Sequence, residues 1–382
     1  MRNRSLRSAG VAAAVASLTL GTVLMSASSA NAAEDPNVTY AKAQVAKSSP
    51  AIQAFKAPGP AIPNVKSLAG KTVYFVPAQY AVPIFKAIGD ALTQSLGAAG
   101  IKVQICDAKA NPSAAADCFQ QAINAKAGAV IVGSLPVEFA PTAFKAVSDA
   151  GIPLVNTLTI PVGPGDPKKI AYFAPNFIGF QAVNTDYIIA NSNAAANVLY
   201  VKATDTPATK IWADAGALAE YKKRCPKCKV TVIETSTGQL SKLPSLISSA
   251  LIKNPKITWI QAEFDSLVQP IVTGLQSSPR RSQIKIVSMD GSLPILQLLK
   301  AKRNVVADYG YNLNAFGWYM ADQALRMMAG QSSLQNVQFP YTRLFQYANT
   351  SRINLTPEAQ NTGEWYGSTD YQAGFKKLWG VG

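Results

Sequence analysis

No position of the 382-residue sequence is a histidine. Without an imidazole, the chain cannot build a Ser-His-Asp or Cys-His catalytic site, and it cannot bind a metal through histidine. Paired carboxylates remain available for acid and base chemistry, so an enzyme is not excluded. Such an enzyme would lack the most common general base of proteins. The missing histidine therefore narrows the possible chemistry without deciding whether the chain is an enzyme.

Cysteine is also scarce, and the four cysteines form two close pairs, Cys106 with Cys118 and Cys225 with Cys228. In an oxidising compartment such pairs predict two disulfides. The alternative for Cys225 and Cys228 is a redox-active motif, because the basic residues before them would lower a thiol pKa. A redox motif of this kind normally opens a helix, whereas this one follows a predicted helix. The spacings do not match those of zinc fingers, so no metal site is expected.

Acidic residues are few, with 21 Asp and Glu against 36 Lys and Arg, and the formal net charge is +15. A basic chain suggests binding to nucleic acid, but the basic residues are scattered. Only YKKRCPKCK, residues 221 to 229, is a dense run. We therefore expect no nucleic-acid partner, and we interpret the charge as favouring solubility or attraction to an acidic cell envelope.

The long apolar run of the chain lies near its N-terminus. MRNRSLR carries three arginines and no acid, AGVAAAVASLTLGTVLM follows as an apolar run, and SASSANA ends in a pattern of small residues. This order predicts a secretion signal over residues 1–32, cleaved near Ala32, and an exported or secreted mature protein. The alternative is an uncleaved membrane anchor.

The chain after the signal has about 350 residues, which is enough for two domains. Residues 33–68 mix Ala, Lys and Pro without a sustained apolar period, which indicates a leader or tether. From residue 71 onward, short apolar strands alternate with amphipathic helices. The predicted strands are KTVYFV, IKVQI, AVIV and IPLVNTL in a first half, and KIAYF, NVLYV, KVTVIE, ITWIQ, IKIVSM and NVVADYG in a second.

This alternation predicts an α/β fold with two doubly wound lobes, each built on a parallel sheet with helices on both faces. In such sheets, ligands bind beyond the carboxyl ends of the strands. Asp290 follows directly on one of these strands, in the segment IKIVSMDGSLP. We interpret it as a ligand-binding carboxylate, and the alternative is an acid that caps the next helix.

Four segments together resemble the type I periplasmic binding proteins of the ribose- and galactose-binding branch, over roughly residues 69 to 330. VYFVPAQYAVPIFKAIGDAL and AGAVIVGSLPVEFAPTAFKAVSDAGIPLVNT are similar to the strands, ligand loops and helices of the family's first lobe. ITWIQAEFDSLVQPIVTGL and KIVSMDGSLPILQLLKAKRNVVADYGYN resemble two segments of its second lobe, the latter with the family's Asp-Gly pair.

The resemblance implies two lobes joined by a hinge of three strands, with chain crossings near residues 156–160, near 311–312 and near 339–342. The N-terminal lobe would comprise residues 69–158 and 312–339. The C-terminal lobe would comprise residues 159–311 and 340–382, with the tail from residue 368 docked on the surface.

The resemblance further implies a monomeric, exported solute-binding protein that passes a small-molecule ligand to an ABC permease. Such a protein has no enzymatic activity and needs no cofactor. The ligand would be a sugar or sugar-like by default. One alternative is a binding protein for an aromatic or apolar metabolite, and another is a ligand-sensing partner of a membrane receptor. An enzyme that uses Glu138, Asp265 and Asp290 as acid and base is a third, more distant alternative.

The ligand-binding residues that the resemblance implies come from loops at the strand ends. The sequence departs from the family there, because Phe264 stands where an asparagine is usual and the first loop lacks its usual asparagine. Rings are therefore expected to be frequent in the cleft. The predicted ligand-binding residues are Tyr80, Phe85, Glu138, Asn176, Trp212, Phe264, Asp265, Asp290, Tyr311 and Asn312.

Overall fold

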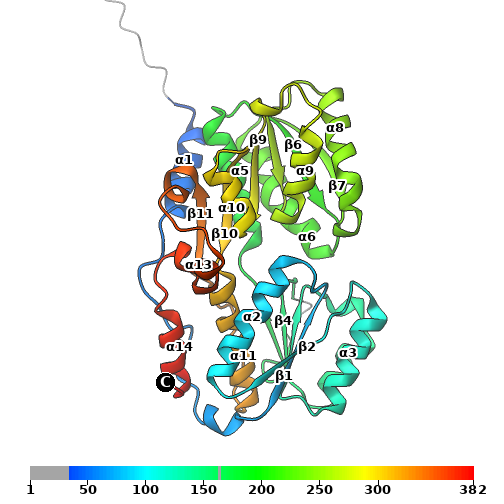
Figure 1. Ribbon diagram of the computed structural model, residues 1–382, viewed down its shortest axis with the longest axis vertical. Coiled ribbons are helices and arrows are strands. Elements are labelled where there is room, and N and C mark those ends of the chain that lie inside the picture. The colour runs from blue at the N-terminus through cyan, green and yellow to red at the C-terminus, as the bar shows by residue number, and fades with distance from the viewer. Residues whose placement is uncertain (1–33, 162–164) are drawn as a thin grey trace, which may run out of the picture. The chain divides into compact units, whose positions relative to one another are not determined.

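The computed structural model describes residues 34–161 and 165–382. The predicted secretion signal, residues 1–32, lies outside these ranges. Within them, no helix combines the length and the apolar character needed to cross a bilayer. Residues 35–382 contain two sheets, each covered by helices, which form two lobes (Figure 1).

The first lobe is built on a five-stranded parallel sheet with the strand order β2-β1-β3-β4-β5. Its central strand β3 is fully buried, because helices cover both faces of the sheet. Apolar side chains therefore run continuously along this strand instead of alternating with polar ones. The strands are β1 (Thr72–Pro77), β2 (Lys102–Ile105), β3 (Ala129–Gly133), β4 (Leu154–Thr157) and β5 (Ile170–Phe173).

Four helices cover the first sheet. Proline stands in the first turn of three of them, where its missing N–H costs no helical hydrogen bond. Asn111 caps the second by accepting hydrogen bonds from the backbone N–H groups of Ser113 and Ala114. The helices are α2 (Pro83–Ala98), α3 (Pro112–Asn124), α4 (Pro141–Asp149) and α11 (Leu313–Met328).

The second lobe is built on a six-stranded sheet with the order β11-β10-β9-β8-β6-β7. Five strands are parallel, and β11 is an antiparallel edge strand beside β10. The predicted class of two doubly wound α/β lobes is confirmed. The strands are β6 (Asn197–Ala203), β7 (Lys229–Thr235), β8 (Trp259–Ala262), β9 (Lys285–Asp290), β10 (Val305–Tyr311) and β11 (Thr342–Gln346).

The helices of the second lobe are α5 (Phe177–Asn191), α6 (Pro207–Ile211), α7 (Ala219–Arg224), α8 (Leu243–Lys253), α9 (Val268–Leu275) and α10 (Leu293–Lys300). A π-helical segment, Trp212–Leu218, joins α6 to α7. Short 3-10 helices lie at Val65–Leu68, Val137–Phe139, Thr237–Lys242, Asp265–Leu267, Arg281–Gln283 and Glu364–Tyr366.

The first crossing between the lobes lies later in the chain than predicted. Strand β5 pairs in parallel with β4, with Leu154 opposite Ile170, so residues 170–173 still belong to the first sheet. The crossing therefore falls at residues 174–176, between β5 and α5, and the boundary predicted after residue 158 needs correction. The segment KIAYF reads like the start of a new half because register is not visible in an isolated strand.

The segment predicted to be a leader or tether contains an ordered helix, α1 (Pro36–Ser48), capped by Asp35. It packs against α5 of the second lobe. The guanidinium of Arg224 lies 3.2 Å from the centroid of the Tyr40 ring on α1, a cation–π contact. Val65 and Leu68, further along, are buried in the first lobe. Residues 35–68 thus run along both lobes.

The C-terminal segment also differs from its prediction. After β11, α12 (Tyr347–Thr350) and α13 (Pro357–Thr362) lead to α14 (Tyr371–Trp379), which packs on α11 of the first lobe. Tyr371, Phe375 and Trp379 recur every four residues, so they share one face of α14, and all three are buried. The assignment of the whole range 340–382 to the second lobe, with a surface tail, is therefore wrong for α14.

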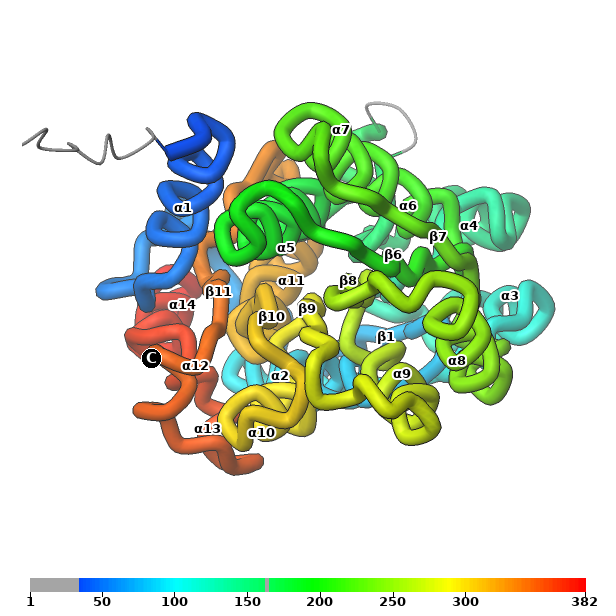
Figure 2. Tube along the Cα trace, turned by 90° about the horizontal axis from the view of Figure 1, so that it is seen from above, coloured from blue at the N-terminus to red at the C-terminus, as the bar shows by residue number. Residues whose placement is uncertain are grey.

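The two flanking segments pair with each other on one side of the lobes, where Figures 1 and 2 both place α1, β11 and α14. The backbone N–H of Ile52 donates to the carbonyl of Tyr366 at 2.8 Å, and the N–H of Ser368 donates to the carbonyl of Ile52 at 3.0 Å. The Phe55 N–H donates to the Asp370 carboxylate, and the Phe55 ring lies 4.9 Å from that of Phe375. These contacts hold segments that are more than 300 residues apart in the sequence.

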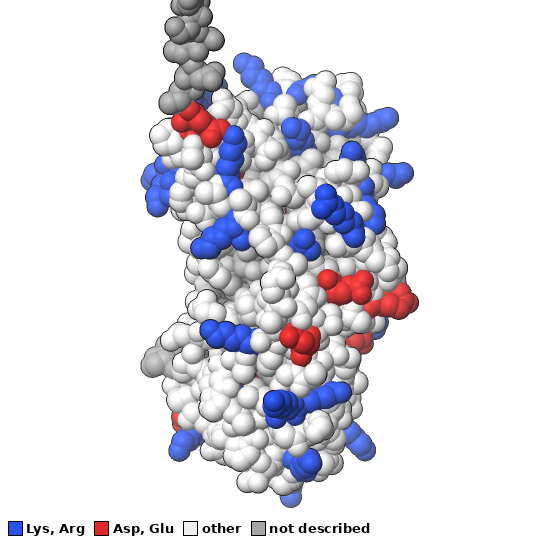
Figure 3. All heavy atoms as spheres, turned by 90° about the vertical axis from the view of Figure 1, so that its left-hand side faces the viewer, with Lys and Arg blue, Asp and Glu red and all other residues white. Residues whose placement is uncertain are grey.

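Basic side chains are dispersed among uncharged ones on the face of the molecule shown in Figure 3. This distribution agrees with the scattered lysines and arginines of the sequence. It favours a general effect of charge over a dedicated site for nucleic acid on that face.

Candidate ligand-binding cleft

A cavity of about 790 Å³ lies between the two lobes. Its walls come from loops that follow β1 and β3 in the first lobe and β6, β8, β9 and β10 in the second. These are the carboxyl ends of parallel strands, which is where the sequence predicts a ligand. The volume is within the range of pockets that bind small molecules.

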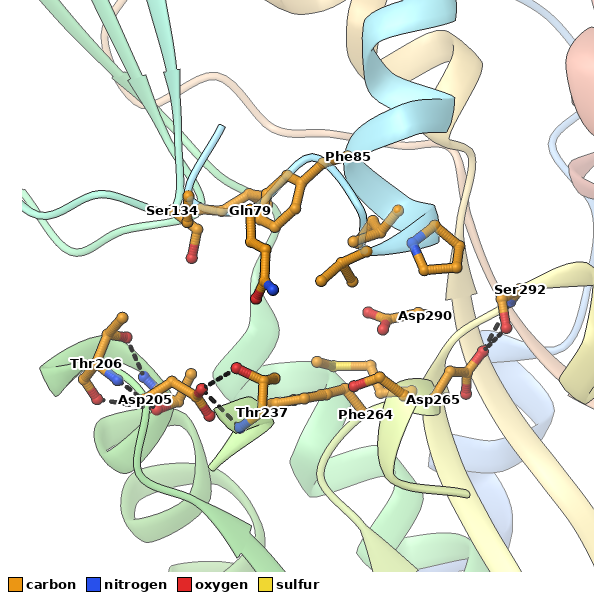
Figure 4. Close-up of a pocket in the computed structure, with 18 of the residues that line it drawn as sticks. Gln79, Phe85, Ser134, Asp205, Thr206, Thr237, Phe264, Asp265, Asp290 and Ser292 are labelled. Carbon is orange, nitrogen blue, oxygen red and sulfur yellow. Dashed lines mark hydrogen bonds between the residues drawn. The ribbon is translucent and has the colours of Figure 1, made fainter. Parts of the chain in front are cut away.

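The wall from the first lobe is mainly apolar. Val82, Ile84 and Phe85 come from the start of α2, and Leu135 and Phe139 come from the loop after β3. Polar groups on this wall are few, and they belong to Gln79, Ser134 and Glu138. Figure 4 shows the Gln79 amide directed into the cavity, above Phe264.

The wall from the second lobe carries a group of rings. Phe177 begins α5 at the crossing between the lobes, and its ring lies 4.4 Å from that of Trp212 and 5.4 Å from that of Tyr311, measured between centroids. Phe264 follows β8 and lies on the floor of the cavity in Figure 4. The contacts of the Phe177 ring with Trp212 and Tyr311 hold these three rings in place before any ligand arrives.

Asp265 is buried beside the cleft and is fully engaged by the protein. Its carboxylate accepts hydrogen bonds from the Ser288 hydroxyl at 2.7 Å and from the Ser292 N–H at 2.8 Å, and also from the Ser292 hydroxyl (Figure 4). Burial nevertheless raises the pKa of Asp265 to about 6, because these bonds offset only part of the desolvation. Its main role here is to hold the end of β9 to the start of α10.

Asp290 ends β9 with its carboxyl group in the cavity (Figure 4). Its φ angle is +132°, a conformation that side-chain-bearing residues rarely adopt and that recurs at functional sites. Burial, followed by the nearby Asp265 carboxylate, raises the pKa of Asp290 well above its ordinary value. Asp290 does not cap α10, whose N-cap residue is Ser292, so the alternative role considered for it does not apply.

Asp308 is a buried acid that the sequence analysis missed. It lies on β10 behind Asp290, with no exposed surface, and one carboxyl oxygen accepts from the Gly291 N–H at 3.1 Å. The other oxygen has no donor among the described residues, which favours a proton shared with Asp265. Burial and the two neighbouring carboxyl groups raise the pKa of Asp308 well above its ordinary value. The position of this acid within the otherwise apolar run VVADYGY could have indicated from the sequence that it is a special buried residue.

The structure brings seven of the ten predicted ligand-binding residues together in the cleft: Phe85, Glu138, Trp212, Phe264, Asp265, Asp290 and Tyr311. The other three do not line it. Asn176 and Asn312 cap α5 and α11 by accepting from the N–H groups of Gly179 and Ala315. The Tyr80 backbone N–H donates to Asp107, and its ring lies against Gly89.

Gln79, Phe139 and Phe177 line the cleft and were not predicted. Phe177 directly follows Asn176, so a crossing placed correctly at residues 174–176 would have indicated it. The two cysteine pairs lie away from the cavity, with the sulfur atoms of each pair at bonding distance. No cluster of three or more potential metal ligands occurs among the described residues.

The model of the periplasmic binding protein domain family matches residues 73–332. No curated protein matches the chain significantly. Among solved structures, a 5-methylthioribose transporter solute binding protein from Thermotoga lettingae is 16% identical, with a TM-score of 0.69, over 80% of this chain and 96% of that one. The match to the family model thus covers most of both lobes.

Two further structures have the same fold. A sugar ABC transporter protein from Yersinia enterocolitica is 16% identical, with a TM-score of 0.68, over 85% of this chain and all of that one. An ABC transporter periplasmic solute binding protein from Actinobacillus succinogenes, with bound D-allose, is 14% identical, with a TM-score of 0.66, over 74% of this chain and all of that one. At these sequence identities the similarity shows a shared fold and nothing more specific.

Proposed function

Because the chain belongs to the periplasmic binding protein domain family, we propose that it is the exported solute-binding protein of an ABC importer. It binds a small molecule without enzymatic conversion and without a cofactor, and it presents that molecule to a membrane permease as a monomer. The observation that carries this proposal is the 790 Å³ cavity, which lies where the strand ends of two sheets face each other.

The mechanism follows from the hinge. The lobes are connected at residues 174–176, at Asn312 and between α11 and β11, so small backbone rotations there change the distance between the two walls. A ligand that contacts both walls binds the closed form more tightly than the open form and shifts the population toward it. Closure converts occupancy into a shape that a permease distinguishes from the empty protein.

Sugars are the first ligand class to consider, since several structural relatives bind them, and since aromatic rings stack on the apolar faces of sugars. The second class is an aromatic or otherwise apolar metabolite. The density of rings and aliphatic side chains in the cleft favours this second class. A ligand-sensing partner of a membrane receptor remains the alternative role for the same fold.

Export is supported by the signal pattern of residues 1–32 and by the two cysteine pairs, which suit an oxidising compartment. Cleavage near Ala32 and two disulfides predict a definite mass for the mature protein. Mass spectrometry of protein recovered from the native host, before and after alkylation under non-reducing conditions, tests both. Free thiols in the native protein would contradict the disulfides.

Ligand binding itself is tested by thermal unfolding of the purified protein with sugars and with aromatic or terpenoid metabolites. A ligand that binds only the folded state must raise the melting temperature. We expect stoichiometric binding without turnover of the compound. Conversion of the compound into a product would instead support the enzyme alternative.

A further inference from the structure

All charged side chains among the described residues that line the cleft are acidic: Glu138, Asp205, Asp265 and Asp290. No lysine or arginine is among these lining residues. Two of the acids are occupied by the protein, because Asp205 accepts from the N–H and hydroxyl of Thr237, and Asp265 is bound to two serines. Glu138 is exposed. Asp290 is the remaining sheltered acid, and among the described residues its carboxyl group accepts only from the Asp265 backbone N–H, which leaves capacity for a ligand.

An anionic ligand is disfavoured by this arrangement. A carboxylate or phosphate near Asp290 would lie close to the Asp265 carboxyl group as well, with no basic residue among the described lining residues to offset its charge. Helix N-termini are other common anion sites, and those of α2, α6 and α10 lie at the cleft. That of α2 has no side-chain cap, but it begins with Pro83, which has no N–H to donate, and the other two already have acceptors. Asp265 accepts the Ser292 N–H at the start of α10, and Thr206 caps α6.

A ligand covered with hydroxyl groups is disfavoured for a different reason. A monosaccharide carries about five hydroxyl groups, and each one loses water on enclosure and needs a new hydrogen-bond partner. The sheltered polar side chains without a hydrogen bond to another side chain in the described ranges are set singly among rings and aliphatic groups; they are Asp290, Gln79, Ser134, Ser266, Tyr311 and Gln360. The remaining surface is made of rings and aliphatic groups.

We infer that the cleft takes a ligand with an apolar, ring-sized body and a polar end that carries hydrogen-bond donors, such as an alcohol or an amine, without an anionic group. The body lies between Phe85 of the first lobe and the rings of Trp212 and Phe264 in the second. The donor end points to the Asp290 carboxyl group. This inference rests on the proposed binding function and narrows it.

The test uses three compounds that share one skeleton: naphthalenemethanol, naphthylmethylamine and naphthoate. Their binding to the whole mature protein is measured by calorimetry and by thermal unfolding at neutral pH, with D-allose as the sugar. We expect the alcohol or the amine to bind about tenfold or more tightly than naphthoate and D-allose. The stronger of these two identifies the donor as a hydroxyl or an ammonium group.

A pair of charge variants locates the effect. Gln79→Lys places a cation in the cleft and should strengthen naphthoate binding relative to the amine by about tenfold. Gln104→Lys adds the same charge on exposed strand β2, outside the cleft, and should leave this ratio unchanged. An equal response of the two variants would mean that general charge, and not the cleft, sets the selectivity, which would overturn the inference.

Other outcomes separate the inference from the proposed function. If naphthoate binds as tightly as the alcohol and the amine, the inference is wrong. If D-allose binds and no naphthalene compound does, the inference is wrong while the solute-binding function stands. If none of the four compounds binds, the inference is wrong, and the proposed solute-binding function is then decided by the wider panel of sugars and metabolites.

Discussion

Two groups of buried carboxyl groups in this protein differ in their partners. Asp322 on α11 accepts from the Arg326 guanidinium at 2.8 Å and from the Trp379 indole N–H at 2.9 Å. At the cleft, three other acids form no ion pair that the structure describes: Asp265 and Asp290, which line it, and Asp308, which lies behind Asp290. The first group is neutralised by the protein, and the second is left without a base. We interpret the first as structural and the second as part of the binding site.

The position of the paired group supports its structural role. Arg326 also donates to the carbonyl of Pro60. The ion pair on α11 therefore binds the N-terminal segment before β1 through Pro60 and the C-terminal segment after β11 through Trp379. Both flanks lie outside the segment that the family model matches. The added segments are thus anchored on a buried charge pair of the first lobe.

Arg326→Met should lower the free energy of unfolding more than any other proposed variant, because it breaks the Asp322–Arg326 ion pair. It leaves the Asp322 carboxylate buried without its cation, which costs about 3 to 5 kcal/mol in the free energy of unfolding. Urea denaturation measures this loss. The matched control is Lys86→Met, which removes an exposed ion pair with Asp90 at the same sequence spacing and should have little effect. Equal losses in the two variants would contradict the structural role of Arg326.

Two buried acids, Asp265 of the unpaired group and Asp186 outside it, predict how stability depends on pH. Burial raises the pKa of Asp265 from 3.8 to about 6, and burial together with Glu220 raises that of Asp186, on α5, to about 8. Each folded pKa is above the unfolded value, so the native state holds more protons in that interval and the free energy of unfolding falls as pH rises. The raised pKa of Asp265 by itself corresponds to a decrease of about 2 to 3 kcal/mol in the free energy of unfolding as the pH rises from below 3.8 to above 6.

Urea denaturation at a series of pH values between about 5 and 8 measures this decline. Asp186→Asn should reduce the decline in the upper part of the range, since the Asp186 carboxyl group titrates there in the folded protein. All other titrating groups are common to both proteins, so the difference between the two curves isolates the contribution of Asp186. A steeper decline in the variant would contradict the prediction.

Asp290→Gly should separate binding from stability. The change removes the carboxyl group and also relieves the backbone strain of a non-glycine residue at a φ of +132°. We expect the affinity for the best ligand of the panel to fall about tenfold or more, which is about 1.4 kcal/mol, while the stability is kept or increased. Calorimetry and urea denaturation measure the two effects. Undiminished affinity would remove Asp290 from the binding site.

Asp308→Asn should have the smallest effect, and it should be stabilising. The amide carbonyl keeps the hydrogen bond from the Gly291 N–H, and the amide N–H₂ can donate to Asp265, so one ionisable group is removed without loss of a contact. We expect a gain of about 1 kcal/mol at a pH near 8, and less at a pH near 5, where the native carboxyl group is already protonated. A loss of stability at both values would show that the acid itself is required.

Much of the fold could be predicted from local patterns. Alternation of strands such as KTVYFV with amphipathic helices such as residues 83–98 identified two α/β lobes, because periodicity reflects which faces of each element are buried. Asp290 and Phe85 could be placed at strand ends for the same reason, since the carboxyl ends of parallel strands share one edge of the sheet. The close spacing of Cys225 and Cys228 likewise made their pairing a local prediction.

Features that depend on contacts between distant segments could not be predicted in this way. Register assigned β5 to the first sheet, packing of apolar faces brought α14 back to α11, and pairing with Tyr366 ordered the chain around Ile52. Asp308 joined Asp265 and Asp290 only because β10 lies beside β9. The sequence by itself determined the elements and their order, since these follow from local periodicity. The tertiary structure decided which distant side chains share the cleft, because that depends on long-range packing and strand register.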